Sequence, residues 1–258
     1  MILWFSGTGN SLAIARRLAT DTGDTLMSLY DAVRSDLSKE STIGLVYPSY
    51  YFNPPQAVTA LVERLSLPRN AYVFIVITCG AQTGNSVWAV ERILRKKGLK
   101  VAYCHKIRVP DCSAIGFGRD PNMQKWKFER YASRLDVISS HIKAKRHSRY
   151  YGAPGLAGWI CALPWVKRRT LPLLQPAVDK HKCIGCSVCM KVCPQGNIRM
   201  KEGAKADTGV AYISDRCVQC LSCVHFCPQQ AVVIAGKPTP KKHQYHNPQI
   251  KIKDLIRR

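Results

Sequence analysis

The sequence predicts an α/β protein with a doubly wound parallel sheet of five strands, followed by a small second domain organised around cysteines. Two observations lead to this prediction. Up to Pro110, short apolar runs alternate with segments of helical periodicity, which is the pattern of a parallel sheet covered on both faces. Eight of the 12 cysteines then fall between Cys183 and Cys227 at regular spacing.

The apolar runs are expected to be the strands, and the stretches between them the helices. The expected strands are 1–5, 25–30, 42–47, 71–78 and 100–109. Helical spacing of apolar residues marks 11–20, 54–65 and 85–97. The interval 31–41 has a weaker pattern and is compatible with a short helix.

The rest of the chain divides by composition. The polar, periodic segment 122–146 is expected to be the helix that closes a first domain over 1–148. Residues 149–178 break into Pro, Gly and aromatics, which favours an extended linker. A cysteine domain over 179–236 and a basic tail over 237–258 follow, the tail partly mobile or wrapped on the body.

The cysteines occur as two copies of one motif, C-x2-C-x2-C-x3-C-P, 34 residues apart. Three thiolates at this spacing can wrap an iron-sulfur cube, while the following turn carries the fourth to a neighbouring cluster. One cluster is therefore expected on Cys183, Cys186, Cys189 and Cys227, and the other on Cys217, Cys220, Cys223 and Cys193. Zinc sites are the alternative, but they do not explain a third cysteine followed by a fourth with proline.

The remaining cysteines are scattered singly and are expected to be mostly buried packing residues; they are Cys79, Cys104, Cys112 and Cys161. The segment 179–235 resembles bacterial-type two-cluster ferredoxins. That resemblance implies a small α+β domain holding two 4Fe-4S clusters.

A loop of small and hydroxylated residues joins the first strand to the first helix. Its residues are Ser6, Gly7, Thr8, Gly9, Asn10 and Ser11. Small residues let the backbone close around a phosphate, hydroxyls can donate to it, and the helix N-terminus adds positive potential. The loop lacks the Lys of an ATP-binding loop, and Leu12 replaces the third glycine of a dinucleotide loop. A mononucleotide is therefore expected on this phosphate loop, against the alternative of a simple strand-to-helix turn.

Two further loops follow the third and fourth strands, where ligands of doubly wound sheets bind. The first ring loop, 47–54, supplies Pro48, Ser49, Tyr50 and Tyr51 as candidates. The second ring loop, 78–85, supplies Thr78, Cys79, Gly80, Gln82, Gly84 and Asn85. Packing alone is the alternative role for the two tyrosines.

These loops, together with Val109-Pro110-Asp111, resemble flavodoxins, and with the cysteines they resemble the fusion family in which a flavodoxin-like domain precedes a two-cluster ferredoxin domain. The resemblance implies FMN, its phosphate on the phosphate loop and its ring between Tyr50 or Tyr51 and the second ring loop. The unbroken fifth strand is similar to short-chain flavodoxins. Neither ring loop contains Asp or Glu, which departs from flavodoxins and predicts a less negative flavin potential.

The formal net charge of +23 stays strongly positive when roughly four charges for two clusters and about two for a flavin phosphate are subtracted. Such a surface favours an acidic redox partner or an anionic membrane surface, and nucleic acid is suggested by charge alone. Weak membrane-surface contact is considered for Trp159, Ile160 and Trp165, beside the basic run 167–169.

A cytoplasmic protein is expected, because the chain opens on an apolar strand without a secretory signal. The longest apolar stretch, 152–166, is too short to span a bilayer and is interrupted by Pro154 and Pro164.

Flavin exchanges one or two electrons and each cluster exchanges one, so the expected function is electron transfer to or from a partner enzyme. No motif for a catalytic acid, base or nucleophile is found. The histidines are expected to be solvated or packed, with His105 ambiguous. The competing hypothesis is a self-contained flavin-dependent reductase of a small molecule.

Overall fold

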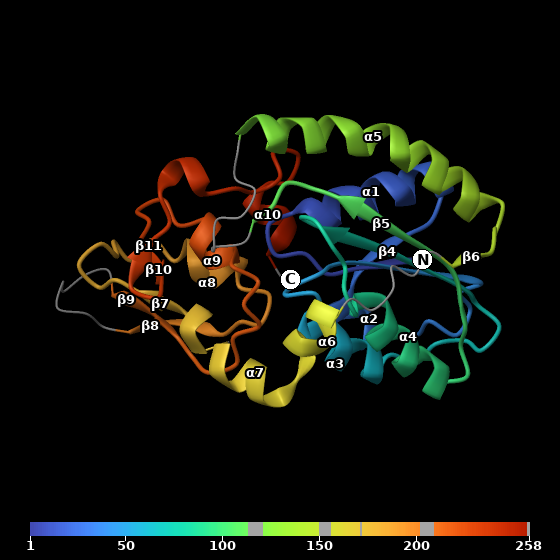
Figure 1. Ribbon diagram of the computed structural model, residues 1–258, viewed down its shortest axis with the longest axis horizontal. Coiled ribbons are helices and arrows are strands. Elements are labelled where there is room, and N and C mark those ends of the chain that lie inside the picture. Colours follow the sequence, from blue (N-terminus) through green and yellow to red (C-terminus); the bar gives the residue numbers. More distant parts are fainter. Residues whose placement is uncertain (113–120, 150–155, 171, 202–208, 257–258) are drawn as a thin grey trace. The chain divides into compact units, whose positions relative to one another are not determined.

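The computed structural model describes the chain except for residues 113–120, 150–155, 171, 202–208 and 257–258 (Figure 1). It divides into two compact units. The N-terminal unit contains Met1–Ser6, Asn10–Asp111 and Asp120–Leu163. The C-terminal unit contains Gly7–Gly9, Cys112–Arg119 and Pro164–Arg258.

The N-terminal unit is built on a parallel sheet with the strand order β2-β1-β3-β4-β5-β6. The strands are β1 (Ile2–Trp4), β2 (Leu26–Ser28), β3 (Thr42–Pro48), β4 (Tyr72–Cys79), β5 (Val101–Arg108) and β6 (Ser148–Arg149). The order 2-1-3-4-5 is that of the flavodoxin-like doubly wound fold. The five predicted strands are confirmed, and the two-residue β6 extends the edge beyond β5.

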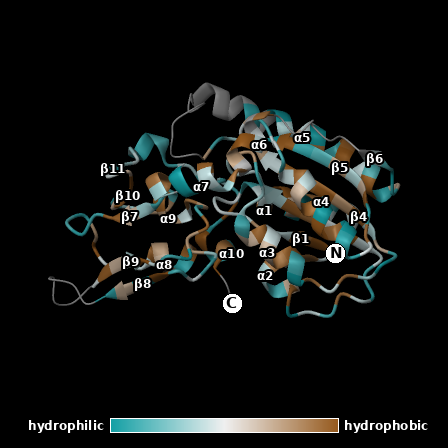
Figure 2. Cartoon of the chain, turned by 60° about the horizontal axis from the view of Figure 1, so that its bottom comes forward, coloured by the Kyte–Doolittle hydropathy of each residue, from teal (hydrophilic) through white to brown (hydrophobic). Residues whose placement is uncertain are grey.

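Helices cover both faces of this sheet, with α1 and α5 on one side and α2, α3 and α4 on the other (Figure 1). They are α1 (Asn10–Thr22), α2 (Leu29–Ala32), α3 (Gln56–Arg64), α4 (Ser86–Lys96) and α5 (Pro121–Lys143). Apolar residues gather along β1 and β4 (Figure 2), and every residue of β4 is buried. Burial on both faces explains why the strands are continuous apolar runs.

The interval 31–41 contains the end of the short helix α2. Ser28 caps this helix by accepting from the backbone N–H of Asp31 at 3.1 Å. Helix α5 confirms the predicted closing helix. In β3, a Cβ on Gly44 would lie 2.2 Å from Cζ of Phe74, so the Phe74 ring occupies the space that a side chain would need.

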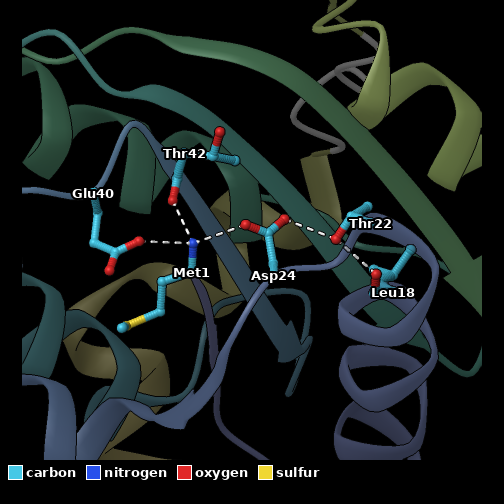
Figure 3. A network of polar contacts seen from close by, with 6 residues as sticks. All are labelled: Met1, Leu18, Thr22, Asp24, Glu40 and Thr42. Atoms are coloured by element: carbon cyan, nitrogen blue, oxygen red, sulfur yellow. Dashed lines mark hydrogen bonds and ion pairs between the residues drawn. The ribbon is translucent and has the colours of Figure 1, made fainter.

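The amino group of Met1 is the centre of a network of polar contacts at the beginning of the sheet (Figure 3). It contacts Asp24 and Glu40 at 3.1 Å each and the carbonyl oxygen of Thr42 at 2.7 Å. Thr22 in turn donates to Asp24 at 2.7 Å. This network joins the ends of three sheet-forming segments through charge-assisted hydrogen bonds.

The expected linker contains regular structure. It forms α6 (Leu156–Ala162), α7 (Pro164–Thr170), the 3-10 turn η1 (Pro172–Leu174) and β7 (Pro176–Val178). The segment therefore contains short helices where an extended connector was expected. Its apolar residues lie close enough in sequence to share helical turns, although prolines and glycines surround them.

The C-terminal unit repeats one pattern of strand, helix and strand. The first copy is β7, α8 (Val188–Val192) and β8 (Ile198–Lys201), and the second is β9 (Val210–Ile213), α9 (Ser222–His225) and β10 (Val232–Ile234). Strand β7 pairs antiparallel with β10, and β8 pairs antiparallel with β9. The exchange of strands between the copies gives them one shared core, which includes Ile198, Ala211, Val224 and Val232.

The basic tail packs on the C-terminal unit over much of its described length. It forms β11 (Lys237–Pro238), η2 (Lys241–His243) and α10 (Ile252–Leu255). Asn247, Ile250 and Leu255 are buried. These residues therefore agree with the expectation that the tail wraps on the body.

Candidate functional site

The eight motif cysteines line two separate cavities of the C-terminal unit. One cavity is lined by Cys183, Cys186, Cys189 and Cys227, and the other by Cys193, Cys217, Cys220 and Cys223. Each cavity thus receives three cysteines of one motif copy and the fourth cysteine of the other copy. This is the crossed grouping that the spacing predicts.

The cavities have apolar linings besides their cysteines. Val178, Ile184, Val188 and Val232 line the first, and Ile198, Ile213, Val218 and Leu221 line the second. Apolar cover limits the access of water, which influences the redox potential of a metal centre.

The backbone has left-handed residues at equivalent places in the two copies. Gly185 and Gln219 have φ values of 70° and 52°, Ser187 and Leu221 both have 58°, and Gly196 and Gln230 have 58° and 52°. Left-handed conformations let a chain turn sharply without forming a regular element. The repeated turns therefore place the cysteines of both copies in the same local geometry.

The thiols occupy an environment that disfavours negative charge. Burial raises the pKa of Cys189 to about 11 and of Cys220 to about 12, and it also raises the pKa of Cys223 well above its ordinary value. The neighbouring cysteines act in the same direction. Four thiolates in such a cavity need the positive charge of iron.

Backbone amides are directed at several of these sulfurs. The N–H of Asn197 donates to Cys193 at 3.3 Å, and the N–H of Ala231, its equivalent in the second copy, donates to Cys227 at 3.2 Å. Hydrogen bonds to sulfur stabilise negative charge on a cluster ligand. Among the described residues, no three His, Cys, Asp or Glu side chains are placed to hold one metal ion. A cube takes one thiolate per iron, so its ligands need not converge on a single point.

The phosphate loop lies between β1 and the first turn of α1. Ser6, Thr8, Asn10 and Ser11 are buried. Ser11 Oγ lies 2.8 Å from Thr78 Oγ1, and the side-chain amide of Asn10 donates to the carbonyl oxygen of Pro110 at 3.2 Å. The loop is therefore joined to the beginning of the second ring loop and to the end of the segment after β5.

The central part of the phosphate loop, Gly7–Gly9, groups with the C-terminal unit. Ser222 donates to the Gly7 carbonyl oxygen at 2.7 Å, and the N–H of Asn247 donates to the Thr8 carbonyl oxygen at 2.8 Å. Gly9 has a φ of 96°, and a Cβ there would lie 2.9 Å from Cβ of Ile250. Both the backbone conformation and Ile250 therefore require glycine at this position.

The two ring loops are bonded to each other. Tyr50 and Asn53 bracket a tight turn whose central residues, Tyr51 and Phe52, have φ values of 49° and 61°. The carbonyl oxygen of Phe52 accepts from the N–H of Asn85 at 2.7 Å. A Cβ on Gly84 would lie 2.3 Å from the same oxygen, so glycine permits this approach.

Further hydrogen bonds connect the ring loops to each other and to the residues beside them. Ser49 donates to the carbonyl oxygen of Thr83 at 3.1 Å, and Ser86 donates to Ser49 at 2.7 Å. Tyr47 donates to the carbonyl oxygen of Ser86 at 3.0 Å, and burial raises the pKa of this phenol. The candidates Pro48, Ser49, Tyr50, Tyr51, Thr78, Cys79, Gly80, Gly84 and Asn85 thus belong to one connected arrangement within the N-terminal unit, and the candidate Gln82 is an exposed residue of the second ring loop.

One buried polar atom in these loops fits a flavin. The side-chain oxygen of Asn85 has no solvent exposure and no hydrogen-bond donor among the described residues. A buried acceptor without a donor is costly in a folded protein. An isoalloxazine ring carries an imide N–H that such an acceptor could bind, so the residues present are compatible with the cofactor.

Sequence reasoning missed two parts of this arrangement. In α6, a Cβ on Gly158 would lie 3.2 Å from Cα of Gly84, so this helix packs on the second ring loop. Asp111 also reaches the loop, since a Cβ on Gly80 would lie 3.0 Å from its carboxyl carbon. Although the ring loops contain no acidic residue of their own, an acidic side chain therefore lies beside the second ring loop.

A cation also reaches the second ring loop. Lys127 of α5 donates to the carbonyl oxygen of Gly80 at 2.8 Å. Burial raises the pKa of Cys79 to about 11, while Lys106, Arg108 and Lys127 act in the opposite direction. Positive charge thus acts on this loop from β5 and α5, and negative charge acts on it from Asp111 in the segment after β5.

Residues 182–231 match the family model of the 4Fe-4S dicluster domain. The C-terminal unit contains a 4Fe-4S dicluster domain. With the strand order of the N-terminal unit, the chain joins a flavodoxin-like domain to this dicluster domain. No curated protein matches the sequence.

Solved structures resemble the N-terminal part. A putative flavoprotein from Bacteroides eggerthii has 16% identity and a TM-score of 0.36, covering 54% of this chain and 96% of its own. A flavodoxin from the domain Archaea has 17% identity and a TM-score of 0.35, covering 54% and 97%. An FMN-dependent NADH-azoreductase from Bacillus anthracis has 11% identity and a TM-score of 0.37, covering 55% and 98%. These values are low, and the fold assignment rests on the strand order itself.

Several histidines serve as packing residues. His225 beside the dicluster cysteines is buried, with Nε2 2.7 Å from the Cys112 carbonyl oxygen and Nδ1 accepting from the N–H of Tyr245 at 3.1 Å. His246 stacks on Phe226 at a centroid distance of 4.7 Å. Of the scattered cysteines, Cys79 and Cys104 are buried, while Cys112 and Cys161 are half-buried. Across the described helices, none has the length and hydropathy needed to cross a bilayer.

Proposed function

We propose that this protein transfers electrons between FMN in the flavodoxin-like domain and two 4Fe-4S clusters in the dicluster domain, to or from a partner redox enzyme in the cytoplasm. The observation that carries this proposal is the division of the eight motif cysteines between two cavities, four to each. Each cavity supplies the four thiolates that one cube requires.

The flavin half of the proposal rests on the loops at the carboxyl ends of the strands. Ser6 to Ser11 would hold the phosphate, and the two ring loops would hold the isoalloxazine ring. When bound, FMN would exchange one or two electrons, whereas each cluster exchanges one. The chain would contribute burial, charge and position, with Asn85 as a hydrogen-bond acceptor and Asp111 and Lys127 as nearby charges.

The test is the cofactor content of protein purified without oxygen. We expect FMN and about eight iron atoms per chain. Replacing Thr8 with Val keeps the side-chain volume but removes the hydroxyl, so this variant should lose flavin and retain iron, whereas Thr59→Val on α3 should retain both. FAD, zinc or about half the iron would each contradict one part of the proposal.

The partner is expected to dock through an acidic surface, because the chain has a formal net charge of +23. Electron transfer to the partner should then slow steeply as salt shortens the Debye length from about 30 to 8 Å. A salt-independent rate would contradict electrostatic steering. Steady reduction of a small molecule without any partner would favour the self-contained reductase instead.

A further inference from the structure

The flavodoxin-like domain has a cavity that the proposed electron transfer does not use. Its volume is about 380 Å³, which is within the range of small-molecule sites, about 300–1,000 Å³. It lies between β5 and α5. The described residues that line it are His105, Lys106, Arg108, Lys127, Arg130, Tyr131 and Arg134.

The charge of this cavity comes from two regular elements. On α5, Lys127, Arg130 and Arg134 recur at intervals of three and four residues, which places them on one face of the helix. On β5, Lys106 and Arg108 are two positions apart and share one face of the strand. Five of the described lining residues are therefore cationic, and none of them is acidic.

The positive potential extends to neighbouring groups. The pKa of His105 is lowered by burial and then by Arg134, His141 and Lys106. Lys127 is almost fully buried, at 8% exposure. A hollow lined by side chains of one sign of charge concentrates ions of the opposite sign, so this lining favours a bound anion.

We propose that this cavity binds a phosphorylated small molecule of about nucleotide size. The arginine guanidinium is planar and binds phosphate through two parallel hydrogen bonds, and Arg108, Arg130 and Arg134 approach from two elements. A hollow of this volume admits a small molecule more readily than the convex surface of a partner protein. The ligand class is therefore a metabolite that carries one or more phosphates.

Binding in the cavity has a route to the flavin loops. Lys127 lines the cavity and also donates to the carbonyl oxygen of Gly80 at 2.8 Å. A phosphate that attracts Lys127 would weaken this hydrogen bond and change the field at the second ring loop. This consequence rests on the proposed function, whereas ligand binding itself does not.

The test is calorimetry on the full chain, purified without oxygen, with ADP, inorganic pyrophosphate and adenosine as probes. ADP and pyrophosphate should bind at physiological ionic strength, and adenosine should not. Arg108→Gln and Arg134→Gln should each weaken ADP binding about ten-fold, as expected for the loss of a charge-assisted hydrogen bond. Arg64→Gln, on α3 at the opposite face of the sheet, is the matched control and should bind ADP like the unaltered protein.

Three results would overturn the proposal. ADP and pyrophosphate could both fail to bind, adenosine could bind as tightly as ADP, or both cavity variants could bind ADP normally. Poly-glutamate that binds more tightly than ADP and depends on the same two arginines would instead identify a protein-docking surface. If ADP binds but the purified chain contains no flavin, the electron-transfer proposal fails while the cavity assignment stands.

Discussion

The first and second copies of the cysteine motif share their backbone and differ in how their side chains are covered. Cys186 is exposed, whereas its equivalent Cys220 is 8% exposed. Met190 is 39% exposed, whereas its equivalent Val224 is 1% exposed. The repeat thus determines where the thiols lie, but it does not determine how much water reaches them.

The difference arises from segments outside the repeat. Gln244 donates to the carbonyl oxygens of Val224 and Cys227 at 2.8 Å each, and Tyr245 donates to His225. These contacts cover α9. The two cavities should therefore differ in chemical stability although their ligand spacing is the same.

The largest expected effect tests the crossed grouping on which the comparison depends. Cys227→Ala removes a ligand from the cavity of Cys183, Cys186 and Cys189, so that cluster should be lost and the iron content should fall from about eight toward about four. Cys193→Ala should destroy the other cluster. Iron analysis and paramagnetic resonance of the reduced protein measure both outcomes, and Cys161→Ser, outside the motifs, should leave eight.

Double variants locate each lesion. Adding Cys186→Ala to Cys227→Ala should cause no further loss, because both residues would serve one cluster. Adding Cys220→Ala should remove the remaining cluster. The opposite pattern would mean that each motif closes on its own metal.

The next effect concerns the rate at which iron is lost. The cluster near exposed Cys186 should react with oxygen or a chelator several times faster than the cluster near Cys220, because water and reagents reach it more easily. Comparing Cys193→Ala with Cys227→Ala isolates the two clusters, and their visible absorbance under chelator gives each rate. Equal rates would show that side-chain cover does not control access.

Removing the cover should reduce the difference between the clusters. Gln244→Ala leaves the carbonyl oxygen of Val224 without its side-chain donor, at a cost of about 1–3 kcal/mol if that oxygen stays dry, whereas the carbonyl oxygen of Cys227 keeps the N–H of Gln230 as a donor. Because Val224 follows Cys223 of the second cavity, and Cys227 of the first cavity keeps a donor, we expect the Cys220 cluster to decay faster in this variant and approach the rate of the other. Gln249→Ala, an exposed residue of the same segment, is the control and should leave the decay unchanged.

Much of this architecture is predictable because it depends on local patterns. Apolar runs alternating with helical periods specify the sheet and its helices, and the spacing of Cys183 to Cys193, repeated at Cys217 to Cys227, groups the thiols. The phosphate loop and ring loops follow from their position after strands. That Ser6 to Ser11 and the ring loops bind FMN, and that the cavities hold clusters, stays a prediction.

The rest depends on contacts between segments that are distant in sequence. The composition of 149–178 does not predict that Gly158 packs against Gly84. That contact depends on the side of the second ring loop on which α6 lies. Asp111 and Lys127 meet at Gly80 for a similar reason. The spacing of Lys127, Arg130 and Arg134 is visible in the sequence, but only the pairing of α5 with β5 adds Lys106 and Arg108 and forms a cavity.

The smallest expected effect concerns stability and one backbone position that the two copies share. Gly196 and Gln230 occupy equivalent left-handed positions, and apart from the two chain neighbours no atom of the described residues lies within 4 Å of a Cβ added to Gly196. Gly196→Ala should therefore cost only backbone energy, about 1–2 kcal/mol for the left-handed conformation, less about 0.4–1 kcal/mol because alanine restricts the unfolded chain. In Gln230→Gly, the contributions of the left-handed conformation and of the unfolded chain both have the opposite sign. The first variant should unfold at lower urea and the second at higher urea, by similar small amounts, when cluster absorbance is followed without oxygen. Destabilisation by Gln230→Gly would mean that the Gln230 side chain contributes more than its backbone conformation costs.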